Sequence, residues 1–196
     1  DLPISAAGYT AAEMENLTTE DNYQGKEGKT LLTGDEGYVE YTFTVNKAGF
    51  YNMRLVYFPL EGTGGSITRS FYIDGALPFE EAAGVEFSRS WADNGPITTG
   101  NDIRPTQVEK PKWMEAEVRD AAGYYNDPLR FYLTEGQHTL RIVSDKEPAA
   151  LHTILLHTAE NLLSYEEQLA AWKAEGYTDA AQSLPLKEAE NAAYKS

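Results

Sequence analysis

The sequence predicts an all-β protein, an antiparallel β-sandwich with a helix near the C-terminus of the chain. Between residues 37 and 157, about eight short segments alternate apolar and polar residues, a period-two pattern typical of strands. Glycine-containing turns separate these segments, and no helical pattern occurs among them. Short strands joined by tight turns favour two antiparallel sheets packed face to face, with a closed barrel as the alternative.

The first two strands form the clearest pair. Residues 37–45, GYVEYTFTV, alternate apolar and polar side chains, and residues 50–58, FYNMRLVYF, repeat the pattern. The turn at residues 46–49 between them predicts an antiparallel hairpin. A third strand is expected at residues 67–73, where Asp74-Gly75 is a turn signal. Further strands are expected at residues 85–89, 115–118, 128–133, 138–143 and 150–157.

The character of the chain changes after Leu163. Ser164 and Glu167 form a capping box, which predicts a helix that runs to about Glu175 and ends at Gly176. This helix is expected to lie outside the sandwich.

The sequence also predicts how the chain is divided. We expect a sandwich module over residues 1–160, a helical linker over 161–186, and the start of a following repeat or domain at 187–196. The last segment is predicted because EAENA at residues 188–192 echoes EMENL at residues 13–17.

The composition excludes several kinds of partner. The net charge of -15 argues against nucleic acid, which is bound by basic surfaces, and against an anionic membrane surface. No run of about 18 apolar residues is present, so direct membrane insertion is not expected. The absence of cysteine excludes disulfides and thiolate chemistry.

A long polar segment interrupts the alternating pattern. Residues 91–113 contain three prolines and two glycines, and irregular segments of such length are usually functional or disordered. We expect an insertion loop that, with residues 120–127, recognises a ligand by aromatic stacking and by polar groups. The candidate ligand-binding residues are Trp91, Asn101, Asp102, Arg104, Trp113, Tyr124 and Tyr125.

Alternative interpretations remain for these residues. Trp91 and Trp113 could instead pin the loop to a sheet, and residues 100–105 could form a turn whose polar side chains satisfy local backbone groups. Arg69 and Arg89 lie in predicted strands, and we expect them to be structural and to reach a shared acidic partner.

No pattern in the sequence predicts catalysis. The histidines at 138, 152 and 157 lack a metal-binding spacing, and no nucleophile motif is present. Acidic residues are abundant, so the occurrence of two carboxylates near each other in the sequence does not indicate glycosidase chemistry. We therefore expect a protein that is not an enzyme.

Five short motifs occur in a characteristic order between residues 11 and 157. They are Glu13-Met14-Glu15, Tyr38-Val39-Glu40-Tyr41, Ala48-Gly49-Phe50-Tyr51, Ile73-Asp74-Gly75 and Gly136-Gln137-His138-Thr139-Leu140. This order resembles the carbohydrate-binding modules of families six and thirty-five. The resemblance implies a galactose-binding-like jelly-roll sandwich and an oligo- or polysaccharide as the partner.

A second resemblance concerns the parent protein. Residues 58–62, 87–91, 100–105 and 123–125 and the helix with Tyr165 are similar to the N-terminal region of large extracellular solute-binding lipoproteins of gut Firmicutes. It implies a bacterial ABC transporter context, a cell-surface location through the parent protein, and contacts with neighbouring domains. The function implied is non-catalytic glycan binding, and the alternative is a structural, protein-contact module without a sugar site.

The first resemblance also implies a structural calcium ion, held through Glu13 and Glu15. No other cofactor is expected. The family places an aspartate on the last strand, near the position where this chain has His152. The long segment 76–127 is a further departure, so ligand residues do not transfer position by position.

Overall fold

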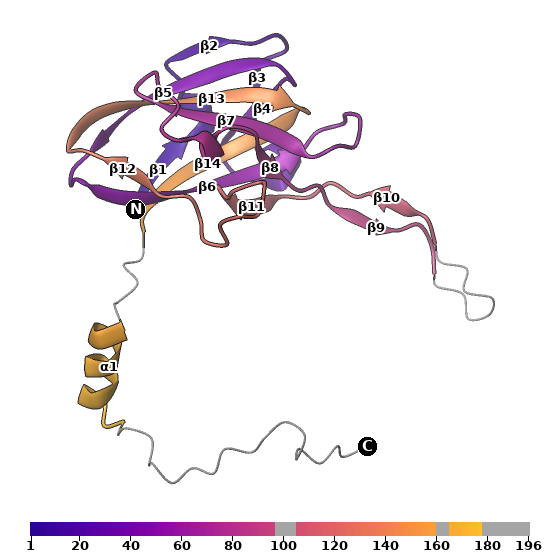
Figure 1. The fold of residues 1–196 in the computed structure, drawn as a ribbon. Coiled ribbons are helices and arrows are strands. Elements are labelled where there is room, and N and C mark those ends of the chain that lie inside the picture. Colours follow the sequence, from indigo (N-terminus) through magenta and orange to yellow (C-terminus); the bar gives the residue numbers. More distant parts are fainter. Residues whose placement is uncertain (97–104, 160–164, 178–196) are drawn as a thin grey trace, which may run out of the picture. The chain divides into compact units, whose positions relative to one another are not determined.

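The computed structural model describes residues 1–96, 105–159 and 165–177. The chain divides into two compact units, Asp1–Ala159 and Glu160–Ser196. The first unit holds all the described strands, and it is the antiparallel sandwich that the sequence predicts. Figure 1 shows its two larger sheets packed against each other and a separate hairpin, β9–β10, that extends away from them.

One sheet has seven strands and the other has five, and all pairings are antiparallel. The seven-stranded sheet contains β1 (Leu2–Ser5), β3 (Thr18–Asp21), β4 (Lys29–Thr33), β6 (Gly49–Pro59), β11 (Met114–Glu117), β12 (Phe131–Leu133) and β14 (Ala149–Thr158). The five-stranded sheet contains β2 (Ala11–Glu13), β5 (Gly37–Val45), β7 (Ile67–Ile73), β8 (Val85–Phe87) and β13 (Gly136–Lys146). Between the described strands lie three short 3-10 helices, η1 (Ala6–Gly8), η2 (Tyr23–Gly25) and η3 (Glu80–Ala82).

The core lies between the two sheets and is built by the period-two pattern of the sequence. On β5, Val39, Tyr41 and Phe43 point inward, and on β6, Met53 and Leu55 do the same; all five are buried. Successive residues on a strand face opposite sides of the sheet, so the polar residues between them face outward. Burying one such apolar side chain contributes about 1.5–3 kcal/mol.

Four strands in the first 37 residues were not predicted. β2 and β3 have every residue exposed, because they lie at the edges of the two sheets. When both faces of an edge strand are exposed to solvent, its residues do not alternate between apolar and polar. The sequence then gives no indication of a strand.

The prediction of an irregular insertion at residues 91–113 was wrong in part. β9 (Trp91–Asp93) and β10 (Gln107–Glu109) form a two-stranded antiparallel sheet in which Trp91 faces Glu109. A ribbon that leaves both faces exposed shows no hydrophobic period, so the prolines and glycines dominated the sequence pattern.

Two long connections meet at one end of the sandwich. The connection after β7 carries Phe79, whose ring lies 5.2 Å from that of Phe131 on β12. The connection between β11 and β12 is fixed to β6, because Asn52 Nδ2 donates hydrogen bonds to the carbonyls of Pro128 (3.2 Å) and Leu129 (2.9 Å). These two connections position the candidate site.

The second unit contains the predicted helix, α1 (Tyr165–Ala174), which has no buried side chain. The proposed capping residue Ser164 lies outside the described residues. Among the described residues, no helix is long and apolar enough to cross a bilayer.

Candidate functional site

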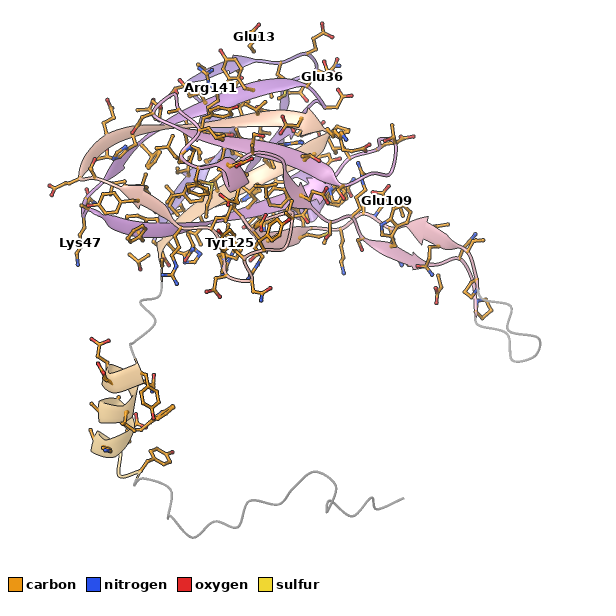
Figure 2. All side chains as sticks on the ribbon, in the orientation of Figure 1. Glu13, Glu36, Lys47, Glu109, Tyr125 and Arg141 are labelled. Atoms are coloured by element: carbon orange, nitrogen blue, oxygen red, sulfur yellow. The ribbon has the colours of Figure 1, made fainter. Side chains whose placement is uncertain are left out.

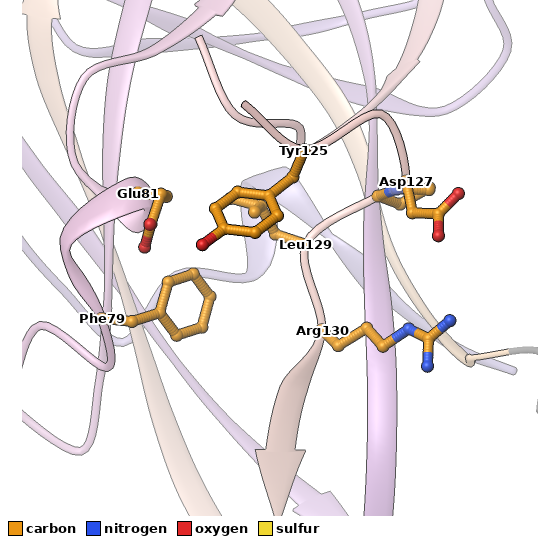
Figure 3. A pocket seen from close by; sticks show the side chains of 7 residues that line it. Phe79, Glu81, Tyr125, Asp127, Leu129 and Arg130 are labelled. Atoms are coloured by element: carbon orange, nitrogen blue, oxygen red, sulfur yellow. The ribbon is translucent and has the colours of Figure 1, made fainter. Parts of the chain in front are cut away.

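A pocket of about 320 Å³ opens between the two long connections. Figure 3 shows Phe79 and Glu81 on one side of it, with Tyr125 above Phe79, and Asp127 and Arg130 pointing away on the other side. The residues that line it are Phe79, Glu81, Tyr125, Asp127, Pro128, Leu129 and Arg130.

The first wall of the pocket follows β7. The chain reverses at Asp74-Gly75, where both residues have positive φ (51° and 78°), as an Asp-Gly hairpin turn requires. It then runs to Phe79, which packs on Phe131, and to η3, which presents Glu81 to the pocket.

The second wall is shaped by Asp120. Its carboxylate accepts hydrogen bonds from the backbone N–H groups of Ala122 (2.9 Å), Tyr124 (2.7 Å) and Tyr125 (3.2 Å). An aspartate that binds the following backbone amides organises a turn without help from a sheet. The positive φ of Gly123 (74°) completes that turn, so an exposed loop holds a defined conformation.

The wall carries two exposed aromatic rings. Tyr124 is 84% exposed and Tyr125 is 57% exposed, and Tyr125 lines the pocket. In Figure 3 the hydroxyl end of Tyr125 points toward Phe79 and Glu81. An aromatic face with carboxylates beside it offers a stacking surface and hydrogen-bond acceptors to a ligand rich in hydroxyl groups.

Trp113 is not part of this pocket. Its ring packs edge-on against Phe58 (5.6 Å between centroids), Tyr23 (6.4 Å) and His152 (5.9 Å), and the Lys26 ammonium lies 5.6 Å from it. Its indole Nε1 is buried without a hydrogen-bond partner. This cluster fixes residues 23–26 to the outer face of the seven-stranded sheet, which favours the structural interpretation of Trp113.

Trp91 lies on the hairpin and is 50% exposed. A Cβ atom placed on Gly64 would lie 3.7 Å from Cη2 of its ring, so one edge of the indole reaches the loop between β6 and β7. Trp91, Trp113 and Tyr125 therefore occupy three different places. The predicted ligand residues Asn101, Asp102 and Arg104 lie outside the described residues.

The geometry does not complete a calcium site at Glu13 and Glu15. Both residues are exposed, and Figure 2 shows the Glu13 side chain on the opposite side of the sandwich from Tyr125. His152 belongs to the other sheet, and its Nε2 lies 2.8 Å from the Glu27 carbonyl. The described residues contain no group of three or more histidine or carboxylate side chains suited to a metal, whereas calcium takes six to eight oxygen ligands.

A larger, polar cavity of about 640 Å³ lies beside β11. Two of the charged groups at its border pair with each other, since Arg54 Nη2 lies 2.7 Å from Glu117 Oε1. Mutual pairing makes this surface less suited to a ligand than the pocket at Tyr125.

The sequence identified Tyr124 and Tyr125 as candidates but missed Phe79, Glu81, Asp127 and Arg130. Phe79 and Glu81 come from a stretch without periodicity, and only the tertiary packing of Phe79 on Phe131 brings them to the second wall. Asp127 and Arg130 lie on either side of Pro128, where a strand was predicted to begin. Charged residues are common in this chain, so their presence there did not indicate a binding site.

No protein-family model matches the sequence, and no curated protein sequence matches it. Among solved structures, the chain is similar to a family 26 β-(1,4)-mannanase of Podospora anserina with a family 35 carbohydrate-binding module. The identity is 12% and the TM-score 0.50, and the match covers 82% of this chain and 28% of the mannanase.

Two other similar structures come from Paenibacillus. A family 35 carbohydrate-binding module of P. barcinonensis is 18% identical, with a TM-score of 0.47, and the match covers 81% of this chain and all of the module. A cycloisomaltooligosaccharide glucanotransferase of Paenibacillus sp. is 18% identical, with a TM-score of 0.45, and the match covers 78% of this chain. The chain spans only 17% of that enzyme's length. At these identities the likeness to the mannanase supports one conclusion, that the chain has the antiparallel β-sandwich fold that its sequence predicts.

Proposed function

We propose that residues 1–159 form a non-catalytic glycan-binding module whose site is the pocket between Phe79 and Tyr125. One observation carries the proposal: an aromatic ring that is 57% exposed is held in a defined loop beside a pocket with carboxylates at its border. An aromatic ring on a loop held in place by a scaffold, with polar groups around it, is an arrangement that binding sites use.

The mechanism follows from the chemistry of the walls. The Tyr125 ring stacks on the C–H face of a pyranose, while Glu81, which lies beside the Tyr125 hydroxyl (Figure 3), accepts hydrogen bonds from the hydroxyl groups of the sugar. The volume of about 320 Å³ is at the lower end of the range for small-molecule sites, which suits one or two sugar units of a longer chain.

The charge of the protein favours an uncharged glycan. The pocket border carries Glu81 and Asp127 against Arg130, and the whole chain carries a net charge of -15. A field of this sign repels polyanionic chains, so uronate-rich or sulfated polysaccharides are poor ligands.

We propose that the module acts outside the cell, within a cell-surface solute-binding lipoprotein of an ABC transporter of gut Firmicutes. The sequence similarity at residues 58–62, 87–91 and 123–125 supports this context. Residues 161–186 would serve as a linker and residues 187–196 would begin the next module. Weak binding by single modules gains strength when several are tethered in one chain.

Calorimetric titration of the protein against neutral and acidic oligosaccharides tests the proposal. We expect binding to at least one neutral oligosaccharide, and Tyr125→Ala should weaken it about tenfold or more, which corresponds to about 1.4 kcal/mol. Tyr132→Ala is the matched control, because Tyr132 is 59% exposed but does not line the pocket. A folded protein that binds no glycan, or equal losses in both variants, would overturn the proposal.

A second candidate function is protein contact through the β9–β10 hairpin. The hairpin is a sheet of its own, and it exposes Trp91 (50%) and Val108 (40%). Unpaired strand edges beside exposed apolar side chains suit contact with another polypeptide. Analytical ultracentrifugation of the parent protein with and without Trp91→Ser tests this candidate. If the hairpin contacts a neighbouring domain, the variant should lose that contact and sediment more slowly.

A further inference from the structure

His138 lies beside the start of the first wall, at Asp74, and beside the end of the segment that continues the second wall, at Thr134. It is 7% exposed, and each of its ring nitrogens meets an acceptor. Nδ1 lies 2.7 Å from Asp74 Oδ2, and Nε2 lies 2.9 Å from the Thr134 carbonyl oxygen. A carboxylate and a carbonyl can only accept hydrogen bonds, and a neutral imidazole has a single N–H to donate. Only the imidazolium form donates to both of these oxygens, since a neutral ring that donates from Nδ1 would instead accept at Nε2 from the Thr134 hydroxyl, 3.3 Å away.

The two partners of His138 belong to the two walls. Asp74 starts the connection that carries Phe79 and Glu81, and Thr134 ends the segment that runs from Arg130 through β12. Asp74 is also bound to β13, because its Oδ1 accepts a hydrogen bond from the Thr139 N–H (2.8 Å) and its own N–H donates to the Thr139 carbonyl (3.0 Å). His138 therefore links the turn at Asp74, which precedes the first wall, to the turn at Thr134, which follows the second wall.

We propose that His138 is a positioning residue for the glycan pocket, and that its imidazolium form holds the two walls in register, so that glycan affinity falls as the histidine is deprotonated. This inference rests on the proposed function, because it concerns the same pocket. His138 does not line the pocket, and it acts through Asp74 and Thr134.

The groups that face the ring decide the direction of the effect. The Asp74 carboxylate comes from the turn after β7, the Thr134 carbonyl and hydroxyl come from the end of β12, and the uncharged ring of Phe43 on β5 lies 5.9 Å away. Burial of the ring opposes its charge, but the hydrogen bonds to Asp74 and Thr134 and the charge of Asp74 outweigh it and raise the pKa of His138.

A histidine whose pKa is raised on folding keeps its stabilising contacts at low pH and loses them as the pH rises through that raised pKa. An unperturbed histidine titrates near 6.5, so the transition is expected above that pH. When the ring becomes neutral it retains one N–H, and either Asp74 or Thr134 loses its donor. The wall next to this acceptor then loses one of the contacts that position it.

The Asp74→Asn variant tests the inference sharply. An asparagine amide donates a hydrogen bond, so a neutral His138 can accept from it at Nδ1 and still donate from Nε2 to Thr134. The Oδ1 contact with Thr139 is retained, and Asn-Gly suits the same turn at positive φ. The variant is therefore expected to fold and to form the same contacts without a charge on the ring.

The first measurement needs no ligand. We expect NMR titration of the wild type to show His138 with a pKa above 6.5, and the amide signals of Phe79 and Tyr125 to shift with the same midpoint. In Asp74→Asn the amide signals of Phe79 and Tyr125 should no longer shift with pH at that midpoint. If the amide signals of Phe79 and Tyr125 do not shift as His138 titrates, the inference is wrong even if a glycan binds.

The second measurement uses mannohexaose and cellohexaose as probes, titrated calorimetrically at pH 6 and pH 9. For the wild type we expect affinity to fall about fivefold or more over this interval, since one hydrogen bond to a charged group is lost. For Asp74→Asn we expect the change to stay within about twofold. Wild-type affinity that is independent of pH overturns the role of His138. Binding to neither probe at either pH counts instead against the proposed function and leaves the NMR result to decide the coupling.

Discussion

Arg89 Nη2 lies 2.5 Å from Glu147 Oε2, in an ion pair whose side chains are 1% and 7% exposed. The same guanidinium donates to Glu109 Oε1 on β10 (2.6 Å) and to the carbonyls of Leu60 and Gly65 (both 2.8 Å). One buried arginine thus joins the base of the β9–β10 hairpin, the loop after β6 and the turn between β13 and β14.

Replacing Arg89 by methionine should destabilise the sandwich by about 3–5 kcal/mol, because it leaves the Glu147 charge buried without its partner. Urea denaturation followed by tryptophan fluorescence measures the loss. Arg141→Met is the matched control, since the Arg141–Glu40 pair (3.0 Å) is partly exposed and such pairs contribute about 1 kcal/mol or less. Equal losses in the two variants would contradict the structural role assigned to Arg89.

The same ion pair predicts a loss of stability in acid. Burial alone would raise the pKa of Glu147, but the hydrogen bonds from Thr63 and the charge of Arg89 outweigh it and lower that pKa. A carboxylate whose pKa is lowered on folding contributes stability that is present at neutral pH and lost as the pH falls through the lowered value. The free energy of unfolding, measured from pH 7 to pH 3, should therefore fall less steeply in Glu147→Gln than in the wild type. An unchanged slope would mean that Glu147 titrates alike in the folded and unfolded chain.

The two tryptophans of the long segment should respond differently to truncation. Trp113→Ala should cost about 2–4 kcal/mol of stability, because its ring packs among Tyr23, Phe58 and His152. Trp91→Ala should cost less than about 1 kcal/mol, because half of its surface is already exposed. Thermal unfolding measures both. If Trp113→Ala instead keeps its stability and loses glycan binding, Trp113 is a ligand residue as the sequence first suggested.

Asp120→Ala should disturb the conformation of the loop at residues 120–127 while changing the stability of the whole domain only slightly. It removes the acceptor of three backbone N–H groups in an exposed loop, so we expect a loss of about 1 kcal/mol or less in stability. Glycan affinity should fall about as far as in Tyr125→Ala, because the ring loses its fixed position. Asp93→Ala, on the hairpin, is the control and should leave affinity unchanged. If Asp120→Ala binds the glycan with wild-type affinity, the hydrogen bonds of Asp120 are not needed to position Tyr125.

The long central strands were predictable because each has one wet and one buried face. Residues 37–45 and 67–73 form β5 and β7 with the predicted bounds, and the predicted strand at 50–58 lies within β6. Arg69 and Arg89 both reach Glu147, but only Arg89 pairs with its acidic group, so the predicted shared acidic partner was right for Arg89 alone. Arg89 binds its carboxylate, while Arg69 Nη2 donates to its carbonyl oxygen (3.0 Å).

The candidate site was less predictable, because its two walls are separated by more than forty residues and meet only through tertiary packing. Tyr125 could be found from its place in a loop that contains Asp120, Gly123 and Asp127. Phe79 could not, since a single phenylalanine in an aperiodic stretch gives no indication that its ring lies against Phe131. The expectation that Trp91 and Trp113 serve one site depended on their closeness in sequence, whereas the hairpin carries Trp91 away from the sheet that holds Trp113.

The Asp120 turn has a consequence for how this protein can change. All three of its hydrogen bonds from residues 122, 124 and 125 come from main-chain amides, so the loop keeps its path with any residue except proline at 124 and 125. Substitution there alters the surface offered to a sugar without refolding the support beneath it. A library randomised at Tyr124 and Tyr125 should therefore yield mostly folded proteins with altered sugar preferences, and the same freedom is available to natural selection.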